Sequence, residues 1–145
     1  MIVQGAGVIE WVGKINQAVF QKDAVGIGQL RDGKLIAGVV YDNYNGNNII
    51  GAITVSAPPP RQFWWAINSY AFETLGCNRI TAYVEEANTK SHNLLKRMGF
   101  ESEGKLEKAG ADGSDITIYR LWKKDCRMLK WGPNHVQESQ NSASA

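Results

Sequence analysis

The spacing of apolar side chains divides the first third of the chain into a helix and a group of strands. Apolar residues recur at largely helical intervals over residues 8–20, which predicts an amphipathic helix with a break near Gly13. Three segments of strand-like composition follow, at residues 24–30, 35–44 and 49–55. Tight-turn sequences at residues 31–33 and 45–48 separate them. We therefore expect these strands to form an antiparallel meander.

The pattern then changes to alternating helices and strands. Residues 58–60 are all proline, which ends a sheet region because proline cannot donate to a strand ladder, and which suits the start of a helix. Residues 61–75 carry an apolar face at helical spacing, and Gly76 is placed to stop that helix. Residues 79–85 predict a strand. Asn88 is placed as the N-cap of a short helix that Gly99 closes, and residues 100–106 and 116–121 predict two further strands.

This order of elements places the chain in the α/β class. We expect a mixed, mostly antiparallel central sheet flanked by helices. The length of 145 residues fits one domain, which we assign to residues 1–131. After Trp131 the composition turns to Asn, Ser, Gln and Ala, which predicts a disordered C-terminal tail over residues 132–145.

Charge and cysteine content exclude several classes of function. The net charge is +2, from 16 basic and 14 acidic side chains, which disfavours a nucleic-acid or anionic-membrane partner. Cys77 and Cys126 lack the spacing of a metal site, so we expect no metal and two buried free thiols in a reducing compartment. No apolar run approaches the roughly 18 residues of a membrane span, and no signal sequence is visible, so we expect a cytoplasmic location.

A family resemblance appears in the second half of the chain. Residues 79–104 combine a strand, the motif Asn88-x-x-Ser91, a short helix ending in Gly99-Phe100, and the pair Glu103-Gly104. This combination resembles the GNAT superfamily of N-acetyltransferases, in the branch that includes the ribosomal-protein N-terminal acetyltransferases. The resemblance covers about residues 24–129, and residues 119–129 also resemble members common in phages and prophages.

The resemblance implies the GNAT fold, acetyl-CoA as cosubstrate, and a primary amine of a protein or small molecule as acceptor. The strands at residues 49–55 and 79–85 would be parallel neighbours that splay at their carboxyl ends and admit the pantetheine arm. The pyrophosphate would bind the N-terminus of the helix that begins near Arg61. The implied cofactor-binding residues are Thr54, Val55, Ser56, Arg61, Gln62, Phe63, Trp64, Asn88, Ser91 and Leu95.

Two residues depart from the family pattern. Trp64 stands where most members have the central glycine of the phosphate-binding turn, and Leu95 stands where many have a tyrosine that protonates the departing thiolate. Ser91 and Asn88 are the nearest substitutes for that acid, although Asn88 also fits a purely structural N-cap. Glu85 is the candidate base, with a solvated surface charge as the alternative. A strand N–H near Val55 would polarise the thioester carbonyl.

Two main functional interpretations remain open from the sequence, beside a weaker third, a structural α/β domain unrelated to CoA. The first is an N-acetyltransferase in which the amine attacks acetyl-CoA directly. The second is a catalytically inactive GNAT-fold module that senses CoA or binds a host protein, which the two departures favour. The aromatic residues fit a ligand slot, a core or a homodimer surface; they are Phe63, Trp64, Trp65, Tyr70, Trp11, Trp122 and Trp131.

Overall fold

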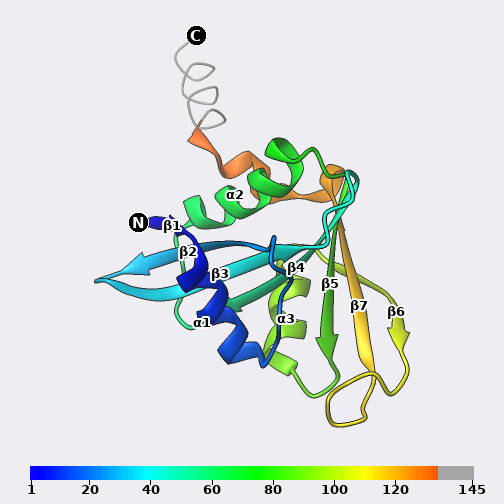
Figure 1. The fold of residues 1–145 in the computed structure, drawn as a ribbon. Helices are drawn as coiled ribbons and strands as arrows, with labels where there is room; N and C mark the ends of the chain where they lie inside the picture. Colours follow the sequence, from blue (N-terminus) through cyan, green and yellow to red (C-terminus); the bar gives the residue numbers. More distant parts are fainter. Residues whose placement is uncertain (134–145) are drawn as a thin grey trace.

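The computed structural model describes residues 1–133, which form one mixed sheet with helices on both faces (Figure 1). The strand order is β1-β2-β3-β4-β5-β7-β6, and only the β4–β5 pair is parallel. The predicted α/β class and antiparallel meander are confirmed; the predicted tail lies outside the described residues apart from Gly132 and Pro133. The strands are β1 Ile2–Gln4, β2 Val25–Arg31, β3 Lys34–Asp42, β4 Asn48–Val55, β5 Arg79–Glu85, β6 Glu101–Leu106 and β7 Ile116–Trp122.

Helix α1 (Ala6–Asn16) packs on one face of the first half of the sheet. Glycines on β2 and β3 allow this close approach, because a Cβ at Gly28 would lie 2.9 Å from a methyl of Val8. The helix passes through Gly13 without a break and ends at Asn16, so the predicted end at residue 20 is wrong. It ends early because Gln17 adopts a left-handed conformation (φ 53°) and its N–H donates to the Gly13 carbonyl.

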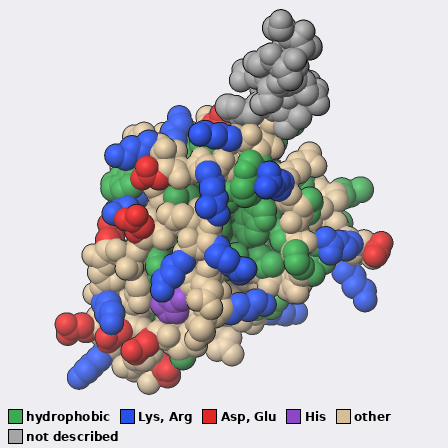
Figure 2. Space-filling model, turned by 180° about the vertical axis from the view of Figure 1, so that it is seen from behind, with side chains coloured by type: hydrophobic (Ala, Val, Ile, Leu, Met, Phe, Trp, Pro, Cys, Tyr) green, Lys and Arg blue, Asp and Glu red, His purple; other side chains and the backbone are tan. Residues whose placement is uncertain are grey.

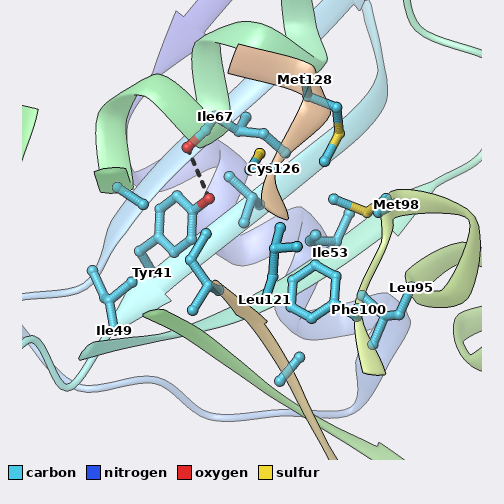
Figure 3. Close-up of a cluster of buried hydrophobic side chains, with 14 of the residues drawn as sticks. Tyr41, Ile49, Ile53, Ile67, Leu95, Met98, Phe100, Leu121, Cys126 and Met128 are labelled. Atoms are coloured by element: carbon cyan, nitrogen blue, oxygen red, sulfur yellow. Dashed lines mark hydrogen bonds between the residues drawn. The ribbon is translucent and has the colours of Figure 1, made fainter. Parts of the chain in front are cut away.

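Helices α2 (Arg61–Ser69) and α3 (Thr89–Met98) lie over the opposite face and enclose the main core (Figure 3). In this core the Tyr41 hydroxyl donates to the Ile67 carbonyl at 2.8 Å, which joins β3 to α2. Cys77 and Cys126 are buried free thiols, as predicted. Burial raises the pKa of Cys126 to about 11.

The helix expected over residues 61–75 changes its geometry part-way. After Ser69 it widens into a π-helical turn, η1 (Tyr70–Thr74), in which the Leu75 N–H donates to the Tyr70 carbonyl. Gly76, at φ 72°, ends it as predicted. Two 3₁₀ helices, η2 (Lys123–Asp125) and η3 (Arg127–Trp131), were not predicted; η3 packs against α2.

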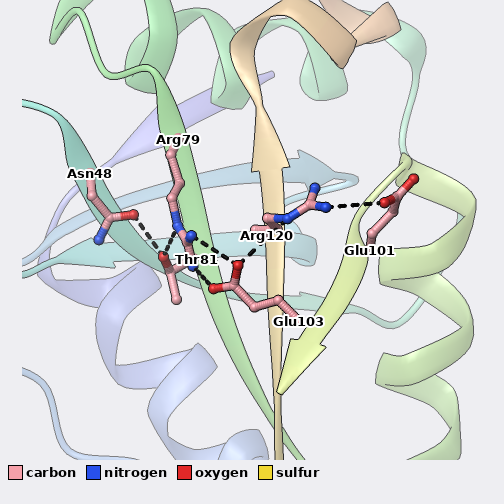
Figure 4. A network of polar contacts seen from close by, with 6 residues as sticks. All are labelled: Asn48, Arg79, Thr81, Glu101, Glu103 and Arg120. Atoms are coloured by element: carbon pink, nitrogen blue, oxygen red, sulfur yellow. Dashed lines mark hydrogen bonds and ion pairs between the residues drawn. The ribbon is translucent and has the colours of Figure 1, made fainter. Parts of the chain in front are cut away.

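A polar network crosses the second half of the sheet (Figure 4). Arg79 on β5 forms a two-pronged ion pair with Glu103 on β6, and Arg120 on β7 contacts the same carboxylate at 3.5 Å. The hydrogen bonds from Arg79 hold the pKa of Glu103 below its usual range. Arg79 also donates to Thr81, which donates to Asn48 on β4 at 2.6 Å. The network therefore ties four strands together at the end where β4 and β5 are paired.

Candidate functional site

The parallel strands β4 and β5 separate part-way along their length. Their pairing runs from Asn48 opposite Arg79 to Ile50 opposite Thr81, and it stops there. β4 continues to Val55 and β5 to Glu85 without pairing to each other. The splay expected at the carboxyl ends of these strands is therefore present.

A cleft occupies this gap and reaches both faces of the sheet. One wall comes from α3 and the opposite side comes from the end of α1. The adjoining pocket along β4 shares Asn88, Ser91 and Leu94 with it. A further pocket shares Leu94 and continues to the turn after β4. The residues around the β4–β5 gap are Asn16, Gln17, Ala18, Gly51, Ala52, Ile53, Ala82, Tyr83, Val84, Glu85, Asn88, Ser91, Leu94 and Leu95.

The free edge of β4 presents backbone groups to this cleft. The Ser56 N–H donates to the Ile36 carbonyl of β3 at 2.8 Å. The direction of hydrogen bonding alternates along a strand, so the N–H and carbonyl groups of Val55 and Ile53 point the other way, toward β5. Because β5 does not pair with β4 at this level, these groups are available to an extended ligand with amide groups of its own.

An apolar pocket lies where the cleft meets the start of α2. Pro60 is the N-cap of this helix and supplies no side-chain hydrogen bond, so the N–H groups of Arg61 and Gln62 lack helical partners. Figure 2 shows the molecule from behind, with apolar side chains gathered in the middle of the face and Lys and Arg side chains around them. The pocket is lined by Val55, Pro58, Pro59, Trp64, Leu94, Arg97, Met98, Arg127, Met128 and Trp131. This combination of unpaired helix N–H groups, apolar walls and cationic side chains suits a ligand with phosphate groups.

Known proteins share this architecture. No family model matches the sequence. Over 59 residues the chain is 41% identical to an uncharacterized N-acetyltransferase, p20, of Bacillus licheniformis; the match covers 39% of this chain and a third (33%) of that protein. Among solved structures, the Campylobacter jejuni N-acetyltransferase PseH in complex with acetyl coenzyme A has a TM-score of 0.56 at 19% identity, covering 79% of this chain and 77% of that chain.

A second solved structure covers more of the chain. A spermidine N-acetyltransferase SpeG chimera from Vibrio cholerae and hSSAT has a TM-score of 0.65 at 16% identity, covering 86% of this chain and 97% of that chain. Together with the splayed parallel pair in a mixed sheet, these likenesses decide the architecture. The chain has the GNAT fold.

Within this GNAT fold, the turn expected to bind phosphate has both buried and exposed side chains. Phe63 is fully buried, so its side chain belongs to the core. Trp64 is half-buried, contacts the edge of Phe63 with ring centroids 5.4 Å apart, and forms a wall of the apolar pocket. Arg61 and Gln62 are exposed, and the Arg61 guanidinium lies 4.7 Å from the ring centre of Trp131. The indole of Trp64 therefore lines the apolar pocket at the start of α2 and does not line the β4–β5 gap.

The predicted residues of α3 come together at the middle of the cleft. Asn88 caps the helix by accepting the Ser91 N–H at 3.2 Å, which confirms the predicted N-cap and leaves the Asn88 amide N–H groups free of that bond. Ser91 lies one turn along, and Leu95 presents a carbon surface, so no proton donor lies at that position. At the end of β5, the Glu85 carboxylate accepts the Ala111 N–H at 2.9 Å. Asn88, Ser91, Leu95 and Glu85 line one cavity.

Two other predicted cofactor-binding residues, Thr54 on β4 and Ser56 just after it, have hydroxyl groups that donate to other parts of the fold. The Thr54 side chain is directed toward α1, where its hydroxyl donates to Asn16 at 3.1 Å. The Ser56 hydroxyl donates to the Ile36 carbonyl at 3.1 Å. A ligand contact from either residue stays a prediction.

Among the residues at the site that were not predicted are three with polar side chains that can bind a ligand. They are Asn16 at the end of α1, Arg97 at the end of α3, and Arg127 on η3. None belongs to a recognisable motif, and each reaches the cleft through packing between elements far apart in the sequence. Within residues 1–133 no helix is long and apolar enough to cross a bilayer, and no group of three or more His, Cys, Asp and Glu side chains is placed to hold a metal ion.

Proposed function

We propose that this chain is an N-acetyltransferase that moves an acetyl group from acetyl-CoA to a primary amine by direct attack. The observation that carries the proposal is the β4–β5 gap, which presents unpaired backbone groups of Ile53 and Val55 and opens on both faces of the sheet. A thioester can enter from one face and an amine from the other. The fold is shared with PseH, whose structure contains acetyl coenzyme A.

The cofactor would lie along β4 toward α2. The pantetheine amides would pair with the backbone at the carboxyl end of β4, beginning at the Val55 carbonyl, as a further strand would. The pyrophosphate would accept the free N–H groups of Arg61 and Gln62 at the start of α2, where the helix dipole also favours an anion. Arg97 and Arg127 border the same pocket and would complement the remaining phosphate charge.

The chemistry would take place beside Ser91 and Glu85. The amine nitrogen attacks the thioester carbonyl carbon, a C–N bond forms, the C–S bond breaks, and the thiolate takes up a proton. The Val55 N–H would polarise the carbonyl. Glu85 would accept the proton of the attacking amine, directly or through water. The Ser91 hydroxyl and the Asn88 amide would donate hydrogen bonds to the departing thiolate, because Leu95 cannot.

Protein amines and small amines both fit as acceptors. The resemblance to the ribosomal-protein branch favours a protein N-terminus, whereas the SpeG likeness concerns a spermidine N-acetyltransferase. The nearly balanced charge disfavours an acceptor attached to RNA. The phage-like origin and a homodimer stay predictions.

Acetyl-CoA binding and thiol release test the proposal together. We expect acetyl-CoA to raise Tm saturably, and free CoA to appear when a suitable amine is added from a panel of peptides, lysine derivatives and polyamines. Saturable stabilisation with no thiol release for any amine would favour the inactive binding module. The absence of any shift in Tm would contradict a CoA site altogether.

A further inference from the structure

Asn16, the last residue of α1, faces the cleft from the side opposite α3. It lines both the part of the cleft at the β4–β5 gap and the neighbouring pocket along β4, and Asn88 and Ser91 line both as well. The chain reverses directly after it, because the N–H groups of Gln17 and Ala18 both donate to the Gly13 carbonyl. This reversal leaves Asn16 as the end of the helix that borders the β4–β5 gap.

Thr54 fixes the orientation of the Asn16 side chain. The Thr54 side chain is almost fully buried, at 7% exposed, so its hydroxyl requires a hydrogen-bond partner. That partner is the Asn16 Oδ1 atom, which accepts the Thr54 hydroxyl at 3.1 Å. With its oxygen engaged, the Asn16 amide has its Nδ2 hydrogens left to donate, and Nδ2 has no hydrogen-bond partner within residues 1–133.

We propose that the Asn16 Nδ2 group donates a hydrogen bond to the thioester carbonyl oxygen of bound acetyl-CoA, with Thr54 as the positioning residue. The inference rests on the proposed function. A carbonyl oxygen has two lone pairs, and the Val55 N–H on the same stretch of β4 would supply only one donor. The oxygen gains negative charge when the amine attacks, so a second fixed donor strengthens as the reaction proceeds.

The alternative is that Asn16 serves only to hold the end of α1 against β4. The two roles predict different effects of a substitution at Asn16 on the binding of acetyl-CoA and of CoA. A structural anchor affects acetyl-CoA and CoA alike, whereas a donor to the thioester carbonyl affects only the acylated cofactor. The ratio of the two Kd values therefore separates the roles without knowledge of the acceptor amine.

Isothermal titration with acetyl-CoA and with CoA, without an amine, measures this ratio. In Asn16→Ala we expect acetyl-CoA binding to weaken about 3- to 10-fold, as for one lost hydrogen bond, while CoA binding changes less than about 2-fold. Asn16→Asp keeps an acceptor for the Thr54 hydroxyl but removes the donor. The ratio of the Kd values for acetyl-CoA and CoA should therefore change at least as much as in Asn16→Ala. Asn93→Asp, on the exposed face of α3, makes the same charge change away from the cleft and should leave the ratio unchanged.

The positioning role of Thr54 is tested in the same titration. Thr54→Val should reduce the preference for acetyl-CoA in the same direction as Asn16→Ala, and Thr54→Ser should retain it. Equal weakening of both ligands in Asn16→Ala and Asn16→Asp would overturn the inference and leave the proposed function intact. A wild-type protein that binds neither ligand would overturn both. If Asn16→Ala fails to fold, the comparison of Asn16→Asp with Asn93→Asp decides the question.

Discussion

The His92 ring nitrogen Nδ1 lies 2.6 Å from the Tyr119 hydroxyl, which joins α3 to β7. The other ring nitrogen, Nε2, lies 3.1 Å from the Glu85 carbonyl oxygen. Because a carbonyl only accepts, Nε2 carries a proton and donates it to the Glu85 carbonyl, while Nδ1 shares a hydrogen bond with the Tyr119 hydroxyl. These two contacts fix the first turn of α3 against the end of β5 and the middle of β7, and so they hold Asn88 and Ser91 at the cleft.

The two partners of this hydrogen bond should contribute unequally to stability. Tyr119 is only 2% exposed, so His92→Phe leaves its hydroxyl buried without a partner and should lower the free energy of unfolding by about 1–3 kcal/mol. Tyr119→Phe removes the buried hydroxyl itself and leaves a half-buried imidazole that water can reach, so it should cost less. Urea unfolding of both variants checks the order. A larger loss in Tyr119→Phe would contradict it.

The contact between α1 and the sheet depends on the absence of a side chain at Gly28. A Cβ there would lie 2.7 Å from a Leu35 methyl and 2.9 Å from a Val8 methyl. We expect Gly28→Ala to lower the free energy of unfolding by about 1–3 kcal/mol through overpacking. Gly7→Ala is the matched control, because its Cβ would meet nothing within 4 Å, and it should stabilise α1 by about 0.5–1 kcal/mol. Equal effects in urea unfolding would argue against the close helix–sheet contact.

The free energy of unfolding should fall in strongly alkaline solution. Burial raises the pKa of Cys126 from its ordinary value of 9.0 to about 11, so the folded protein retains a thiol proton that the unfolded chain loses. The stabilisation is complete below pH 9 and is lost between about pH 9 and 11, with a slope of at most about 1.4 kcal/mol per pH unit. Cys126→Ala should flatten this slope in urea unfolding measured across that range. An unchanged slope would show that another group dominates.

Local signals in the sequence predicted much of the fold. The Asn88 cap, the stop at Gly99 and the end at Gly76 each depend on the conformation of a single residue, and each is present. The meander was predictable because alternation and turn residues act over a few positions. The early end of α1 could not be predicted, because residues 17–20 continue the apolar spacing of the helix. The helix ends only because the Gln17 backbone adopts a left-handed conformation.

Less of the candidate site could be predicted from the sequence. Glu85, Asn88 and Ser91 lie close together along the chain in one motif, so their grouping could be predicted. The hydrogen bond between Thr54 and Asn16 joins residues 38 positions apart, and η3 reaches α2 only through tertiary packing. No pattern in the sequence encodes such contacts, which depend on how tightly α1 and η3 pack against the sheet and α2.

The hydrogen bonds proposed for the thiolate can be removed without removing the helix cap. Asp caps helices about as well as Asn but lacks the amide N–H groups, so Asn88→Asp keeps the acceptor for the Ser91 N–H. Combined with Ser91→Ala, it should lower kcat by more than about 10-fold, because both donors to the leaving group are lost, while Tm stays near that of the wild type. Thiol release at saturating acetyl-CoA with an active amine measures kcat, and Asn93→Asp again controls for charge. Wild-type turnover in the double variant would mean that the thiolate leaves without assistance from α3, and that Asn88 serves only as the cap.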